Sequence, residues 1–218
     1  MSRRTLGAGF LTLLFSLAAL AADGGKVENV GAFADQSAPE AVRKALAPNG
    51  YRVTLADGGV ACEVWFRATV PAGKTDASGA VYTTLPEGAL IGVITFPKAA
   101  NDFRGQAIKA GTYTLRYEVH PTDGNHMGIS PIRDFLLLVP VAADPNPETN
   151  YKFEELVKLS AKASGTNHPA VMSLAAPASG AAPSVTTDEH NHAVFAAKVK
   201  TASGDMPIAF VVKGVAEQ

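Results

Sequence analysis

The feature that most constrains the fold is a two-residue alternation of apolar and polar side chains in short runs. The segment 51–55 reads YRVTL, the turn DGG follows at 57–59, and the segment 60–69 reads VACEVWFRAT. Successive side chains of a β-strand point to opposite faces, so this period is typical of strands with one buried face. Turn residues between neighbouring runs favour antiparallel hairpins.

Further runs of the same kind follow along the chain, at 112–120, 170–174, 193–200 and 208–213. Two others, ALIGVITF at 89–96 and FLLLV at 135–139, are apolar on both faces, and we expect them to be central strands. The connections are too short for crossover helices. The sequence therefore predicts a mainly β fold, a two-sheet antiparallel β-sandwich of roughly seven to nine strands.

Two short helices are expected beside the sandwich. Ser37 and Glu40 have the spacing of a capping box, and Pro48-Asn49-Gly50 ends the helix that this box would start. A second helix is predicted between Asn146 and Gly165, residue types that suit the two helix ends.

The first 22 residues have the composition of a secretory signal peptide. Arg3 and Arg4 precede an uncharged apolar stretch at 6–20, and Ala19 and Ala21 are small residues suited to cleavage after Ala21 or Ala22. A retained membrane anchor and the twin-arginine route are the alternatives. We expect a periplasmic or extracellular protein, without a membrane span after cleavage. Residues 23–36 are expected to be a flexible leader, and 37–218 a single domain with a loop-like segment at 175–187.

The charge balance and the cysteine content exclude some classes of function. Removing Arg3 and Arg4 from the 19 basic residues leaves 17 against 20 acidic residues, a formal charge of −3. No basic run is present to neutralise phosphates, so we expect no nucleic-acid partner. Cys62 is the single cysteine and cannot form an intrachain disulfide, and its place in an apolar alternation indicates a buried side chain.

Polar residues on two predicted strands form the first candidate ligand-binding site. The first strand carries Glu63, Trp65 and Arg67, and the second carries Arg116, Glu118 and His120. An exposed Trp among charged groups can stack on a sugar ring, and Glu63 with Glu118 could serve as the two carboxylates of a glycosidase. The alternative is structural: cross-strand ion pairs on a sheet face and a Trp covered by a loop or helix.

The loop from His120 to Asp134, HPTDGNHMGISPIRD, is the second candidate. It is long, rich in turn formers, and combines His120, Asp123, Asn125 and Arg133, and long loops often carry binding residues. Its structural alternative is a compact cap in which Arg133 is tethered to a strand carboxylate such as Glu118 or Asp134.

Histidines form the third candidate, a Zn or Cu site. His190 and His192 have the spacing of a ligand pair, and His120 and His126 lie on another turn. The alternative is that these side chains are solvated. No other cofactor is expected.

Nucleophile motifs such as Gly-x-Ser-x-Gly and His-Glu-x-x-His are missing from the sequence, so we assign no catalytic residue. The sequence favours an exported, non-catalytic binding or accessory module whose partner is a small molecule, a glycan or a protein. A periplasmic Zn or Cu protein is the alternative, and a hydrolase is a third hypothesis.

Four stretches carry a resemblance to known proteins: GYRVTLADGGVACEVWFR, GQAIKAGTYTLRYEVHPTDGNHMGISPIRDFLLLVP, SGTNHPAVMSL and PIAFVVKGVAEQ. In this order they resemble a family of exported bacterial proteins with no assigned activity. The resemblance implies that the loop from His120 to Asp134 is a feature of the family, and it implies no functional residue.

Overall fold

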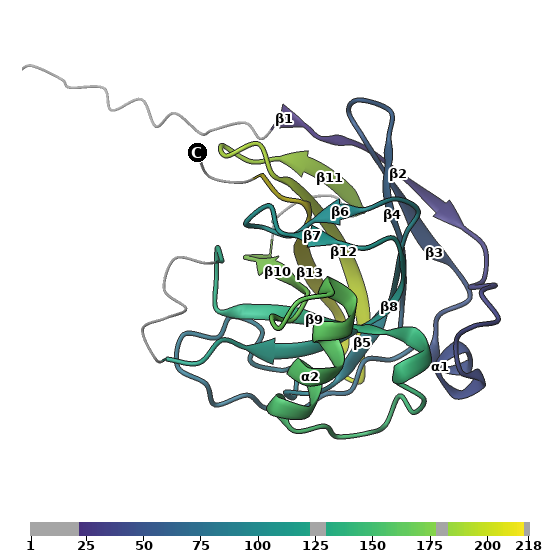
Figure 1. Cartoon of the computed structure of the whole chain (residues 1–218), viewed down its shortest axis with the longest axis vertical. Coiled ribbons are helices and arrows are strands. Elements are labelled where there is room, and N and C mark those ends of the chain that lie inside the picture. Colours follow the sequence, from purple (N-terminus) through teal and green to yellow (C-terminus); the bar gives the residue numbers. More distant parts are fainter. Residues whose placement is uncertain (1–21, 123–129, 178–182, 216–218) are drawn as a thin grey trace, which may run out of the picture.

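The computed structural model describes residues 22–122, 130–177 and 183–215. Of the residues that the structure describes, 43% are in strands and 12% in helices, with two α-helices, so the predicted mainly β class with two helices is confirmed. Figure 1 shows strands enclosing the interior while the helices lie outside them. No helix in the described ranges is long and apolar enough to cross a membrane.

One antiparallel sheet contains most of the strands, in the spatial order β1-β11-β12-β13-β10-β9-β8-β5-β4-β3-β2. A separate two-stranded sheet is formed by β6 (Ala100–Asn101) and β7 (Ala107–Ile108). The strands of the large sheet are β1 (Ala22–Asp23), β2 (Gly25–Val30), β3 (Gly50–Leu55), β4 (Val60–Phe66), β5 (Leu90–Phe96), β8 (Gly111–Val119), β9 (Asp134–Pro140), β10 (Val171–Ala175), β11 (Ser184–Thr187), β12 (Ala193–Thr201) and β13 (Gly204–Lys213).

The large sheet curls until it nearly closes into a barrel. Two segments, β10 and the run from β1 to β2, each pair with strands from both ends of the strand order. In β10, residues 171–173 pair with β9, whereas Leu174 and Ala175 pair with β13. On the other side, β1 pairs with β11 and β2 pairs with β3, with only Gly24 between them. This continuous sheet differs from the predicted two-sheet sandwich. Both architectures have the same alternation of inward apolar and outward polar residues, so the pattern does not distinguish them.

Two of the expected irregular segments are strands in the structure. Residues 25–30, inside the predicted flexible leader, form β2 and pair with β3 over its whole length. Residues 184–187, inside the predicted loop at 175–187, form β11, while 178–182 lie outside the described residues. Both segments are short and polar on one side, so each has too few apolar residues for a clear alternation.

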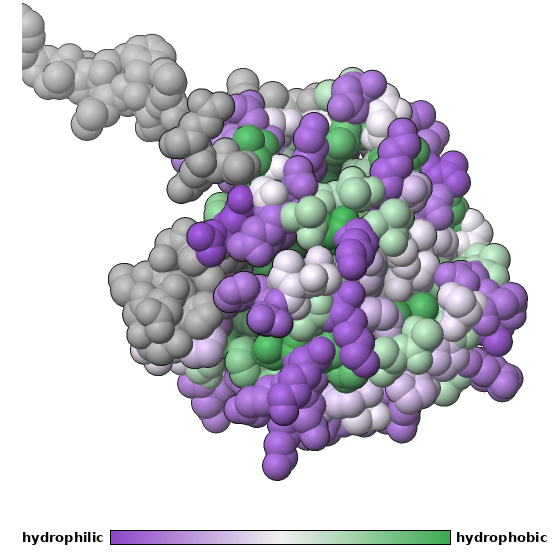
Figure 2. All heavy atoms as spheres, viewed as in Figure 1, coloured by the Kyte–Doolittle hydropathy of each residue, from purple (hydrophilic) through white to green (hydrophobic). Residues whose placement is uncertain are grey.

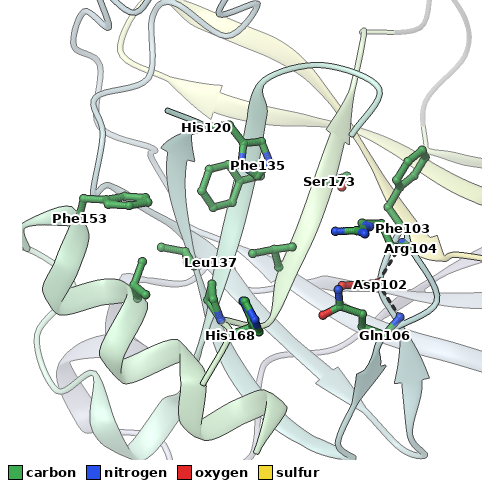
Figure 3. A pocket seen from close by; sticks show the side chains of 13 residues that line it. Asp102, Phe103, Arg104, Gln106, His120, Phe135, Leu137, Phe153, His168 and Ser173 are labelled. Carbon is green, nitrogen blue, oxygen red and sulfur yellow. Dashed lines mark hydrogen bonds between the residues drawn. The ribbon is translucent and has the colours of Figure 1, made fainter. Parts of the chain in front are cut away.

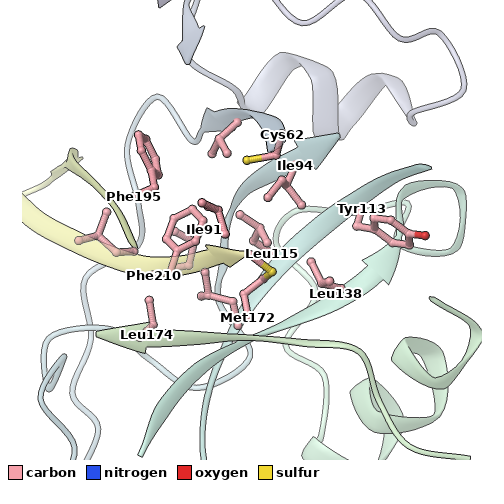
Figure 4. Close-up of a cluster of buried hydrophobic side chains, with 14 of the residues drawn as sticks. Cys62, Ile91, Ile94, Tyr113, Leu115, Leu138, Met172, Leu174, Phe195 and Phe210 are labelled. Atoms are coloured by element: carbon pink, nitrogen blue, oxygen red, sulfur yellow. The ribbon is translucent and has the colours of Figure 1, made fainter. Parts of the chain in front are cut away.

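The interior of the curled sheet is filled by side chains. Phe66 stacks on Phe195 with 6.4 Å between ring centroids, and Phe210 meets Phe195 edge-on at 5.4 Å. Figure 4 shows aliphatic and aromatic side chains from opposite strands converging there. Cys62 lies in this core with no exposed surface, as the sequence predicts, and burial raises the pKa of its thiol.

An outer layer covers the far side of β5, β8 and β9, so these strands are buried on both faces. It consists of α1 (Glu40–Ala45), the 3₁₀ helix η1 (Val141–Ala143) and α2 (Phe153–Ser164). This arrangement confirms the central position predicted for 89–96 and 135–139.

The predicted helix starts differ from the observed ones. Pro39 is the N-cap of α1 and no side chain caps the helix, whereas Ser37 lies two residues earlier, where its backbone amide donates to Asp35 Oδ1 at 2.8 Å. The second helix begins at Phe153 and not at Asn146. It ends as predicted, at Gly165, whose φ of 71° is left-handed.

Candidate functional site

Trp65, expected as an exposed ring, is covered. Its exposed fraction is 6%, its Nε1 donates to the carbonyl of Gly31 at 2.9 Å, and Phe33 meets the ring edge-on at 5.0 Å. The segment before α1 and α1 itself pack over it. Trp65 is therefore a Trp covered by a loop and a helix, which was the structural alternative, and its ring face is not available for a sugar to stack on.

The charged neighbours of Trp65 are engaged in ion pairs. Glu63 accepts from Arg52 at 2.7 Å, and Arg67 pairs with Glu148 at 2.5 Å across to the segment before α2. Glu63 and Trp65 do line a shallow depression of about 310 Å³ beside residues 30–35. The structure places Arg67 outside this depression.

Arg116 is a structural residue with no exposed surface. Its Nε and Nη2 bind the two carboxylate oxygens of Asp144 at 2.8 and 2.7 Å. Its remaining bonds go to the carbonyls of Gly88, Asn146 and Thr149, and the ring of Tyr151 lies 5.0 Å from the guanidinium carbon. This network explains why α2 starts late: the 146–149 backbone wraps around Arg116.

Glu118 is buried, with 2% of its surface exposed, opposite Phe135 on β9. Burial, and secondarily the charge of Glu87, raise the pKa of Glu118 to about 8. Glu63 aligns through β5 with Thr112, six residues before Glu118 on β8. That separation is about 20 Å along a strand. It is too long for the carboxylate pair of a glycosidase, so the predicted Glu63–Glu118 pair does not form.

His120 and Arg133 lie at the two ends of the long loop, whose Asp123, Asn125 and His126 lie outside the described residues. The His120 ring stacks on Phe135 with 4.0 Å between centroids. Arg133 donates to the carbonyls of His120 and Ser78, and not to a strand carboxylate as its structural alternative proposed.

Asp134, at the end of the same loop, anchors the segment before β5. Its carboxylate accepts from the amides of Val81 and Tyr82 at 2.9 and 2.8 Å and from the hydroxyl of Tyr117 at 2.7 Å. Asp134 therefore has a structural role, because it holds this segment against the sheet.

The predicted histidine pair is divided between two environments. His192 is buried, its Nδ1 lies 2.9 Å from Asp188 Oδ2, and Phe103 lies 4.4 Å from its ring. His190 is exposed on the same turn. Within the described ranges, no group of three or more His, Cys, Asp or Glu side chains is arranged to hold a metal ion.

A pocket of about 410 Å³ lies on the outer side of the sheet, between α2 and the turn that joins β6 to β7 (Figure 3). In the whole-molecule view of Figure 2, hydrophobic side chains are visible near α2 among hydrophilic ones. The described residues that line the pocket are Asp102, Phe103, Arg104, Gln106, His120, Phe135, Leu137, Phe153, Val157, His168, Pro169, Val171 and Ser173. Among the described residues that were predicted to bind a ligand, His120 alone belongs to this lining.

The two sides of the pocket differ in chemistry. The sheet contributes Phe135 and Leu137, both almost completely buried, and α2 contributes Phe153 and Val157. The polar groups of Arg104 and Gln106 come from the opposite side, as Figure 3 shows.

Asp102 shapes the turn that carries these polar groups. Its Oδ1 accepts from the backbone amides of Arg104 and Gln106 at 2.9 and 2.8 Å. Burial raises the pKa of Asp102, and those two hydrogen bonds oppose the increase. The ring of Phe103 packs against His192, which connects the turn to the loop before β12.

The described lining of the pocket contains one serine hydroxyl, that of Ser173, and two histidine rings, those of His120 and His168. Activation of that hydroxyl as a nucleophile would require a base within hydrogen-bond reach.

Sequence reasoning missed most of the pocket. Phe153 and Val157 belong to the apolar stripe of the predicted helix, which is typical of a core-facing surface. The turn at 102–106, DFRGQ, falls between predicted strands. Its Arg and Gln were the available indication of a polar binding group, and no motif in the neighbouring sequence marked them as such. The two segments are about 50 residues apart in the sequence, so the sequence does not indicate that they lie on the same pocket.

Comparison of the whole chain with protein-family models, with curated proteins and with solved structures finds no match. The function must therefore be inferred from the chemistry of the pocket.

Proposed function

We propose that this protein is an exported, non-catalytic binding module that holds a small, mostly apolar molecule in the pocket between α2 and the β6–β7 turn. The observation that carries the proposal is the pocket itself: about 410 Å³, with an apolar floor and wall and a few polar groups on one side. Sites for small molecules are usually concave, mostly apolar and about 300–1,000 Å³ in volume.

The elements around the pocket are held in place before any ligand arrives. The Arg116–Asp144 pair fixes the segment that leads into α2, and Ser160 on α2 donates to the carbonyl of Ala170 beside β10 at 2.8 Å. On the other side, the Asp102 hydrogen bonds define the turn. A preformed site loses less free energy to ordering when it binds, which supports a binding role.

The interior of the curled sheet is a less suitable place for a ligand. Phe66, Phe195 and Phe210 occupy its centre and contact one another. A ligand there would have to displace packed core side chains, at a cost comparable with that of overpacking. The outer pocket needs no such change.

Export belongs to the same proposal. The predicted signal peptide lies mostly outside the described residues. We therefore propose the periplasmic or extracellular location from the sequence, together with the resemblance to a family of exported bacterial proteins.

The test is binding of the neutral probe N-phenyl-1-naphthylamine, whose fluorescence rises in apolar sites. The Val157→Trp variant places a bulky ring in the pocket and should weaken probe binding by about tenfold or more. Lys158→Trp is the matched control, because Lys158 is exposed on the same helix and does not line the pocket.

The control should bind like the wild type, and circular dichroism should show that both variants fold. If folded Val157→Trp binds the probe with wild-type affinity, or if the wild type does not bind it, the proposal is wrong.

A further inference from the structure

We infer that the ligand of this pocket is a small amphiphile with a single carboxylate head group, which pairs with Arg104, and an apolar body that lies against α2 and the sheet. This inference rests on the proposed function and specifies the chemistry of the ligand. It follows from the distribution of charge and burial around the pocket.

Arg104 is the charged group available to such a head. Its side chain is exposed, lines the pocket and makes no hydrogen bond or ion pair with another side chain among the described residues. The carboxylate of Asp102, in the same lining, accepts two backbone amides of the turn through Oδ1, and the positive charge of Arg104 acts on it without a hydrogen bond between the two side chains. No described side chain accepts a hydrogen bond from the Arg104 guanidinium, and Gln106 and His168 add further polar groups to the same pocket.

The rest of the pocket suits an apolar body. Phe135, Leu137 and Val171 form the floor on neighbouring strands, and Phe153 and Val157 form the wall on α2. Figure 3 shows Phe153 on the side opposite Arg104, so a bound amphiphile can extend from the polar turn to the helix. Each methylene that leaves water for this surface strengthens binding.

One charge on the head matches the pocket best. A guanidinium donates two parallel hydrogen bonds to a carboxylate, and such a pair is both charge-assisted and directional. A phosphomonoester carries close to two negative charges, whereas the described lining supplies one permanent cation. A cationic head would face Arg104 and be repelled.

The experiment compares three probes of equal chain length: decanoate, decanol and decylamine. Each displaces N-phenyl-1-naphthylamine from the full chain, and affinities are measured for the wild type, Arg104→Gln and Lys98→Gln. Lys98 is exposed and outside the pocket lining, so the Lys98→Gln variant changes the net charge equally and is the matched control.

We expect decanoate to bind about tenfold more tightly than decanol and decylamine to bind most weakly. Arg104→Gln should weaken decanoate about tenfold and change decanol by less than about twofold, whereas Lys98→Gln should change neither. The decanoate advantage should also shrink as salt is added, because the pair is partly exposed.

Two kinds of failure are distinguishable. If decanol and decanoate bind equally and Arg104→Gln affects both alike, the carboxylate inference is overturned while the pocket remains a binding site. If none of the three displaces the probe and Val157→Trp has no effect on probe binding, the proposed function fails with it.

Discussion

The Arg116 guanidinium makes five hydrogen bonds in a site with no exposed surface, two of them to Asp144. Burying two charges costs desolvation energy, which their attraction offsets only when every donor is satisfied. Here the donors are satisfied partly by backbone carbonyls of the segment before α2. A single side chain therefore couples the outer face of the sheet to the helix that forms one wall of the pocket.

Replacing Arg116 by Met should destabilise the fold by about 3–5 kcal/mol, because Asp144 would remain buried without its cation. The free energy of unfolding is measured by urea denaturation. Arg52→Met is the matched control: Arg52 pairs with Glu63 at the surface, and the loss should be less than about 1 kcal/mol. Equal losses in the two variants would show that the buried pair has no special role.

At the scale of the element, most strands were predictable because their alternation or their doubly apolar runs are long. The segments 89–96 and 135–139 were predicted as central strands and are β5 and β9. The helix start at Asn146 was wrong because the backbone at 146–149 binds Arg116, an interaction between segments 30 residues apart. Capping signals describe local preferences and carry no information about such a partner.

The closure of the sheet depends on backbone geometry that alternation does not encode. β1 and β2 pair on opposite sides, which requires a sharp change of direction at Gly24 and Gly25. Gly25 has a φ of +134°, and an added Cβ would lie 2.0 Å from the carbonyl oxygen of Thr54. A side chain at this position is excluded by both conformation and space.

Gly25→Ala should therefore destabilise the protein by roughly 1–3 kcal/mol and weaken the pairing of β1 with β11. Gly31→Ala is the control, since no atom lies within 4 Å of a Cβ there and its φ is not left-handed; the expected change is within about 0.5 kcal/mol. Hydrogen exchange supplies the local readout: the amides of 184–187 should exchange faster in Gly25→Ala alone. Unchanged exchange would mean that the pairing of β1 with β11 does not depend on this glycine.

At the scale of the whole molecule, the binding site that we propose lies outside the sheet and is assembled from segments distant in the chain. Sequence analysis identified His120 but not Arg104 or Val157, because polar residues in a turn and apolar residues on a helix each have an ordinary structural explanation. The predicted residues Trp65, Arg116 and Glu118 are instead buried beneath the outer layer. Alternation shows which face a residue occupies and does not show whether another layer covers that face.

The same covering layer makes the stability of the whole molecule depend on pH through Glu118. Burial raises its pKa from 4.5 to about 8, so between these values the folded state binds a proton that the unfolded state has released. A raised carboxyl pKa stabilises the fold fully below pH 4.5, and this contribution is lost as the pH rises to about 8.

Glu118→Gln keeps the neutral shape and should remove that loss, so at pH 8 the variant should be more stable than the wild type by on the order of a few kcal/mol. Urea denaturation across this range measures the slope, with Glu28→Gln as control, because Glu28 is exposed on β2. A wild-type slope that persists in Glu118→Gln would assign the pH dependence to another group.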